Sequence, residues 1–113
     1  MRLYLVDRKK NTIVSGGEKV FPSEVEGLLA SHPKVMDVAV IGVPHDHWGE
    51  SVHAVIVLHE DQSATEREIL DWCIGKIAGY KRPRSAKFIR EEEMPRTATG
   101  KILHRVLRER HAK

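Results

Sequence analysis

The chain has 113 residues, of which 41% are hydrophobic and 31% charged, with a formal net charge of +3, as in one ordinary globular domain. No apolar run approaches the ~20 residues of a membrane-spanning helix, and the N-terminus lacks the apolar stretch and cleavage site of a signal peptide. The single cysteine, Cys73, excludes an internal disulfide and is expected on the buried face of a helix, which fits a reducing cytoplasm.

Basic residues gather at the two ends of the chain, whereas most carboxylates lie between Glu18 and Asp71. Four cations stand in the first ten residues, and a second group begins at Lys81. This distribution fits either two ends that meet a polyanion or a solvated surface with charges of both signs. A nucleic-acid-binding domain is disfavoured, because only six Phe, Trp and Tyr residues are present and single-strand binding needs exposed aromatic platforms.

Two short strands are expected at residues 3–6 and 12–14, and together they form a leading hairpin. The second strand stops at Gly16 and Gly17. Adjacent glycines adopt backbone angles closed to other residues, so they suit a tight turn or a loop pressed against a ligand. General frequencies favour the turn.

Residues 23–26 have the pattern of a capping box behind Pro22, and they predict a helix that ends at Pro33. The nearly all-apolar, β-branched run 35–43 is typical of a central strand covered on both faces. Apolar residues alternate over 52–59, which predicts a further strand.

His45 and His47 lie between these two strands, where no further ligand cluster accompanies them, so solvent-facing histidines are favoured over a metal site. A second capping box at residues 65–68 opens another helix, and residues 86–89 predict the last strand. The sum is an α+β domain with a short N-terminal β-hairpin, a three-stranded sheet and about three helices.

A loop at residues 97–101 precedes an amphipathic segment, so Gly100 is interpreted as the last loop residue and Lys101 as the first residue of a helix. The helix dipole disfavours a cation there by roughly 0.3–1 kcal/mol. The lysine is therefore either solvated or, together with the helix end, faces an anion. A Walker phosphate loop is excluded, because Pro95 and Ile102 stand where it needs a glycine and a Ser or Thr.

Five motifs resemble, in order and spacing, the C-terminal domain of the adenylate-forming enzymes: acyl- and aryl-CoA synthetases, luciferases and peptide-synthetase adenylation domains. They occupy residues 7–10, 15–18, 21–26, 79–83 and 95–102, so the resemblance covers essentially the whole chain. Lys10 and the Ser-Gly-Gly-Glu run are most similar to fatty-acyl and related acid–CoA ligases. Such enzymes activate a carboxylate with ATP and then transfer the acyl group to CoA, and the small C-terminal domain swings between the two steps.

The resemblance implies a role for several residues. Lys101 matches the lysine that reaches the substrate carboxylate and the α-phosphate during adenylation, where a fixed positive charge meets two anions. Lys10 matches the hinge about which the domain rotates, and Arg8 matches an arginine that contacts the nucleotide ribose. Gly16 and Gly17 match the loop that lies against the pantetheine channel in the second step.

Other positions match less closely. Lys81, Arg82 and Arg84 lie where some relatives contact CoA phosphates. Lys19 stands where an Asn or Gln is usual, at a position that can face the adenylation site, so its ammonium either touches phosphate or is solvated. Asn11 stands where an Asp is common.

By this resemblance residues 1–10 are the hinge and leading strand, and residues 11–113 are the mobile domain. The family's N-terminal ATP- and acyl-binding domain is not in this sequence, so we expect a piece of a longer cytoplasmic ligase. That ligase uses a small carboxylic acid, ATP and CoA, with Mg²⁺ held through the missing domain, and the isolated chain is expected to be inactive. The alternative is a free-standing binding or regulatory module that completes a partner subunit in trans.

Overall fold

The computed structural model describes residues 11–111, so the strand expected at residues 3–6 lies outside the described residues. Its strands are β1 (Ile13–Ser15), β2 (Glu18–Val20), β3 (Val35–His45), β4 (Gly49–Leu58) and β5 (Ser85–Phe88). Its α-helices are α2 (Pro22–Ala30), α3 (Glu66–Trp72) and α4 (His104–His111), and two short 3-10 helices are η1 (Gly79–Lys81) and η2 (Glu91–Glu93).

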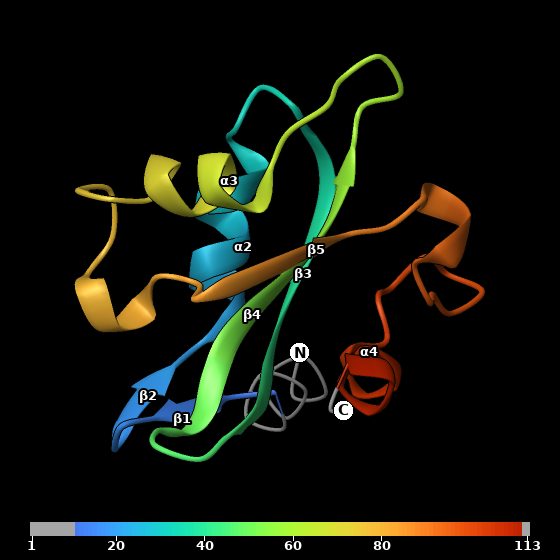
Figure 1. The fold of residues 1–113 in the computed structure, drawn as a ribbon. Coiled ribbons are helices and arrows are strands. Elements are labelled where there is room, and N and C mark those ends of the chain that lie inside the picture. The colour runs from blue at the N-terminus through green and yellow to red at the C-terminus, as the bar shows by residue number, and fades with distance from the viewer. Residues whose placement is uncertain (1–10, 112–113) are drawn as a thin grey trace.

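All five strands belong to one sheet in which β4 is central (Figure 1). The long strands β3 and β4 pair antiparallel, from Val35 opposite Leu58 to His45 opposite Gly49. On its other side β4 pairs with β1 at its start and then, in parallel, with β5. The strand order β2-β1-β4-β3 therefore places β3 at an edge of the sheet.

Gly16 and Gly17 form the turn between β1 and β2, with φ angles of 60° and 84°. Two successive residues in the left-handed region are what a two-residue hairpin turn requires, so the expected tight turn is confirmed. The strand that follows the turn, β2, was not expected from the sequence. The hairpin also joins the main sheet, because Ser15 pairs with Gly49 of β4.

The sheet separates two apolar cores. Alternate residues of β3 and β4 face α2 and α3 on one side, and the intervening residues face α4 on the other (Figure 1). The first core includes Val40, Ile56 and Ile69, and the second is built around Ile41 and Leu107. This arrangement confirms the α+β class and the two covered faces of β3. The expected central position of β3 is wrong, because among the described strands β3 is an edge strand with one neighbour, β4. Its two faces are buried because helices cover both sides of the sheet.

The two expected capping boxes have different outcomes. At α3 the Thr65 hydroxyl accepts the Glu68 N–H at 3.1 Å, as predicted. At α2 the helix begins two residues earlier than the box requires, with Phe21 as N-cap, Pro22 in the first turn and no side-chain cap. The Glu26 carboxylate, which the box assigned to the helix start, is instead bonded to groups of β3 and α4.

Within residues 11–111, none of the helices is both long and apolar enough to cross a membrane. Cys73 is fully buried at the end of α3, as expected, and desolvation raises the pKa of its thiol.

Candidate active site

Lys101 lies at the end of a tight loop between η2 and α4. The loop closes on itself, because the Thr97 N–H donates to the Lys101 carbonyl at 2.8 Å and the Lys101 N–H donates to the Thr97 hydroxyl at 3.1 Å. Gly100 supplies the bend with a φ of 93°. Arg96 and Ile102 then form an isolated antiparallel bridge across the loop. Lys101 itself is exposed to solvent.

The expectation that Lys101 is the first residue of a helix is wrong. α4 begins at His104, and its first bonds run from the Val106 and Leu107 N–H groups to the Leu103 carbonyl. The bridge at Ile102 holds the chain in an extended form for two residues after Lys101, which delays the helix. The helix dipole therefore does not act on Lys101 at close range, since its effect is confined to the first turn.

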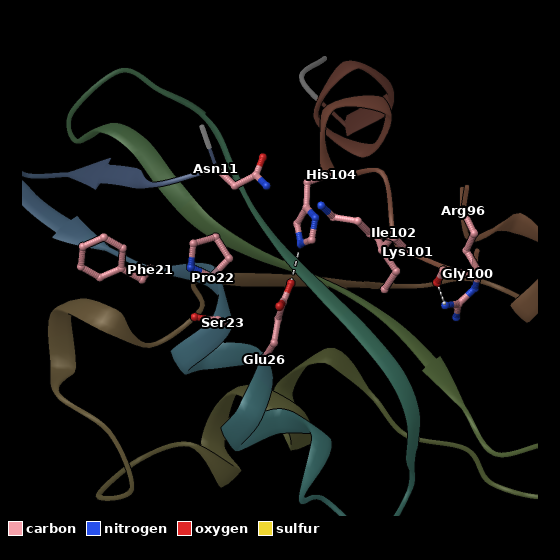
Figure 2. Close-up of a pocket in the computed structure, with 10 residues that line it drawn as sticks. All are labelled: Asn11, Phe21, Pro22, Ser23, Glu26, Arg96, Gly100, Lys101, Ile102 and His104. Carbon is pink, nitrogen blue, oxygen red and sulfur yellow. Dashed lines mark hydrogen bonds and ion pairs between the residues drawn. The ribbon is translucent and has the colours of Figure 1, made fainter. Parts of the chain in front are cut away.

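A hollow of about 330 Å³ opens beside Lys101 (Figure 2). Its lining is mostly apolar and includes Phe21, Pro22 and Ile102. Asn11, Ser23, Glu26, Arg96, Gly100, Lys101 and His104 complete the wall. The hollow therefore joins the start of α2 to the lysine loop and to the start of α4.

Glu26 and His104 face each other across this hollow (Figure 2). The Nε2 atom of His104 lies 2.6 Å from Glu26 Oε2, and the same oxygen accepts the Val40 N–H at 2.9 Å. Because β3 is at the sheet edge, this N–H has no partner strand in the described chain and the carboxylate takes that place. Sequence reasoning missed both residues, and Glu26 was assigned to a helix cap that it does not make.

The Gly16–Gly17 turn lies elsewhere on the molecule. Figure 1 shows the β1–β2 hairpin at the lower left and the loop before α4 at the right, with the sheet between them. Gly16 packs against Trp48: its N–H donates to the Trp48 carbonyl at 2.9 Å, and a Cβ on Gly16 would lie 2.8 Å from the indole ring. Gly17 faces open space, and Lys19 is exposed on the neighbouring strand β2.

Lys81 and Arg82 lie in and just after η1. The Lys81 ammonium contacts both carboxylate oxygens of Glu24 at 2.9 Å, and this hydrogen bond raises the pKa of Lys81. Arg82 lines a second hollow of about 280 Å³ with Arg67 and Arg84. The Arg84 guanidinium also stacks over the Trp48 ring at 4.3 Å, which ties this basic region to the Gly16 turn.

The predicted site residues therefore form two groups. Lys101 lines the first hollow, whereas Gly16, Gly17, Lys81, Arg82 and Arg84 belong to the region around Trp48, η1 and the β1–β2 turn. Arg8 and Lys10 lie outside the described residues.

His45 ends β3 and His47 lies in the turn that follows, and both are exposed. His45 Nδ1 accepts the N–H groups of His47 and Trp48 at 3.1 and 3.2 Å, so its ring shapes the turn. Across residues 11–111, the structure contains no group of three His, Cys, Asp or Glu side chains arranged to hold a metal ion.

Comparison with known proteins adds a family to this geometry. The family model described as the AMP-binding enzyme C-terminal domain matches residues 24–101. The chain is 44% identical over 110 residues to the long-chain-fatty-acid–CoA ligase FadD13 of Mycobacterium tuberculosis, covering 97% of this chain and 21% of that protein. It is 43% identical over 107 residues to a 2-succinylbenzoate–CoA ligase of Bacillus cereus, covering 95% and 21%.

Solved structures show the same relationship. ATP-bound MatB from Rhodopseudomonas palustris superposes with a TM-score of 0.87 at 34% identity, over 93% of this chain and 20% of that one. A fatty acyl CoA synthetase from Mycobacterium tuberculosis gives a TM-score of 0.82 at 42% identity, over 91% and 20%. The chain thus spans about a fifth of the length of the relatives it matches.

Proposed function

Because this chain belongs to the family of AMP-binding enzyme C-terminal domains, we propose that it is the C-terminal domain of an AMP-forming acid–CoA ligase of the fatty-acyl-CoA synthetase type. The names of the relatives support the reaction class, since each is a CoA ligase or acyl-CoA synthetase. The observation that carries the proposal is the position of Lys101, on a closed loop at the mouth of a hollow within the one domain that these ligases share with this chain.

The proposed reaction has two steps. In the first, a carboxylate oxygen of the acid attacks the α-phosphorus of ATP, the bond to pyrophosphate breaks, and an acyl-adenylate forms. In the second, the CoA thiolate attacks the acyl carbon and AMP leaves. The first step brings two anions together, so a fixed cation lowers its barrier mainly through electrostatics and positioning. Lys101 supplies that cation as a point donor and transfers no proton.

The second group of residues is assigned to the second step. The Gly16–Gly17 turn presents backbone without side chains, which suits the passage of a thin pantetheine arm. Lys81, Arg82 and Arg84 form a basic region that is linked to this turn by the stacking of Arg84 on Trp48, and it is suited to the phosphates of CoA. Lys81 must exchange its bond to Glu24 for such a contact.

The β1–β2 hairpin and the loop before α4 lie apart, with the sheet between them (Figure 1). This separation supports a rotation of the domain between the two steps about a hinge at Lys10, with Arg8 at the nucleotide ribose. Lys19 is proposed as a further phosphate contact. In this proposal the N-terminal domain of the same enzyme holds ATP, Mg²⁺ and the acid, and the enzyme works in the cytoplasm.

The function is tested in the longer protein that contains this chain. Incubation with ATP, CoA and a panel of fatty, aryl and dicarboxylic acids is expected to yield AMP, pyrophosphate and an acyl-CoA, whereas the 113-residue chain alone yields none. Release of ADP, or no acyl-CoA from any acid of the panel, would contradict the proposal.

A free-standing module that completes a partner subunit in trans is the second candidate. Immunoblotting of cell extract with an antibody against this domain separates the two. If the chain is a domain of a ligase, the band should be several times larger than 12.9 kDa. If it is a free-standing module, the band should lie at that mass.

A further inference from the structure

The loop that carries Lys101 is tied to β3 at its start and, at its end, to Glu26 of α2, which in turn bonds β3. At its start the Arg96 guanidinium forms an ion pair with the Asp37 carboxylate of β3. At its end the His104 imidazole bonds Glu26, 2.6 Å between Nε2 and Oε2 (Figure 2). We call these two contacts the Asp37 clamp and the Glu26 clamp.

The Glu26 clamp joins three elements through one carboxylate. Glu26 projects from α2, His104 begins α4, and the Val40 N–H on the edge of β3 donates to the same carboxylate oxygen at 2.9 Å. The His104 and Glu26 side chains are only 17% and 23% exposed, so water competes weakly for these bonds. Hydrogen bonds to a carboxylate are shorter and stronger than those between neutral groups. Movement of His104 therefore breaks the bond that links α4 to α2 and, through Glu26, to β3.

The Glu26 clamp fixes the loop that carries Lys101 more than it fixes the packing of α4 on the sheet. Leu107, one turn further along, is fully buried in the second core and anchors the helix to the sheet. His104 lies on the loop side of that anchor, three residues after Lys101. Between them the Leu103 N–H donates to the Pro95 carbonyl at 2.9 Å, which transmits the position of His104 across the base of the loop.

We propose that Glu26 and His104 are positioning residues for Lys101, and that they hold the end of its loop so that the ammonium stands where carboxylate and α-phosphate meet. This inference rests on the proposed function, since it concerns the adenylation step. A misplacement of about 1 Å can cost about 100-fold in rate. Loss of the clamp is expected to lower kcat for adenylation and to leave KM for ATP nearly unchanged, because the nucleotide is held mainly by the other domain.

The test uses the whole ligase and follows each half-reaction separately. Glu26→Ala and His104→Ala are each expected to slow adenylate formation by about 10- to 100-fold. Thioester formation from preformed acyl-adenylate should stay within about 2-fold. The double variant should be no slower than the worse single variant, since the two residues share one contact. His104→Gln should recover much of the rate, because its side-chain amide can donate to Glu26.

Glu68→Ala is the matched control. Glu68 lies on α3, away from the loop that carries Lys101, and its carboxylate forms a 2.9 Å ion pair with Lys34. This variant should keep both half-reactions. Hydrogen exchange of the ligase, followed by mass spectrometry, gives a second measurement: exchange of the peptide covering residues 96–104 should rise in Glu26→Ala and stay unchanged in Glu68→Ala.

Several outcomes overturn the inference and leave the proposed function intact. If Lys101→Ala abolishes adenylation while Glu26→Ala and His104→Ala do not slow it, the clamp does not position the lysine. Equal losses in both half-reactions, or unchanged exchange at residues 96–104, also contradict it. If Glu26→Ala fails to fold, the His104 variants decide alone, because Glu26 then keeps its bond to Val40. Full adenylation by Lys101→Ala would instead refute the role proposed for Lys101, whereas no acyl-adenylate from the unsubstituted ligase would refute the proposed function itself.

Discussion

His53 makes the stability of this domain depend on pH. It lies on the face of β4 toward α4, where its Nδ1 is 2.6 Å from the Ser85 hydroxyl and its ring centroid is 5.3 Å from that of His111. Its Nε2 is buried without a hydrogen-bond partner among the described residues. Burial, reinforced by the nearby His111, lowers the pKa of His53 from 6.5 to about 4.

The sign follows from proton linkage. Because the folded pKa lies below the unfolded one, the unfolded chain binds more protons between pH 6.5 and 4, so stability is full above that window and falls as the pH is lowered through it. At about 1.4 kcal/mol per pKa unit, the depression to about 4 gives a total loss of about 3 kcal/mol, of which about 2 kcal/mol has appeared by pH 5. The pKa of His111 is also lowered by burial, which adds to the loss in the same direction.

Urea unfolding of the 113-residue chain at pH 7 and pH 5, followed by circular dichroism, measures this loss. His53→Gln keeps a partner for Ser85 but has no proton to gain, so its stability should fall by about 2 kcal/mol less than that of the wild-type chain. His59→Gln is the control, since His59 is exposed at the end of β4, and it should behave as the wild type. If all three lose the same stability to within about 0.5 kcal/mol, His53 is not the group responsible.

Three further predictions concern other parts of the domain. Gly16→Ala should lower the free energy of unfolding in urea by about 2 kcal/mol, which is more than the loss in Gly17→Ala. Both glycines have positive φ, but only a Cβ on Gly16 would lie 2.8 Å from Trp48, so equal losses would exclude the clash. Lys10→Pro in the whole ligase should spare adenylation and block thioester formation, and loss of adenylation would refute the hinge. Cys73 should react with a thiol reagent only after denaturation, because it is buried and its pKa is raised; rapid labelling of the native chain would contradict its burial.

Local sequence patterns predicted those elements whose causes are local. The Thr65 cap requires only a hydroxyl and an N–H three residues apart, and it forms as expected. The turn at Gly16 and Gly17 follows from the backbone freedom of two adjacent glycines. The apolar run of β3 correctly indicated that both faces of this strand are buried.

The remaining features depend on residues far apart in the sequence. Glu26 has the spacing of a capping residue, but Val40 and His104, 14 and 78 positions away, take its carboxylate. The helix was expected at Lys101, but the bridge between Arg96 and Ile102 delays it to His104. No periodicity within a short window contains such contacts, so the surroundings of Lys101 emerge only from the folded chain.

The role of Lys101 is the central claim, and the half-reactions of the whole ligase test it most directly. In Lys101→Ala, the rate of acyl-adenylate formation from acid and ATP should fall by at least about 100-fold, as expected for loss of a charge that acts in the transition state. Thioester formation from preformed acyl-adenylate and CoA should remain near the wild-type rate. Lys76→Ala, which removes an exposed lysine over the Trp72 ring, should change neither. Equal losses in the two half-reactions of Lys101→Ala, or an unchanged adenylation rate, would contradict the assignment.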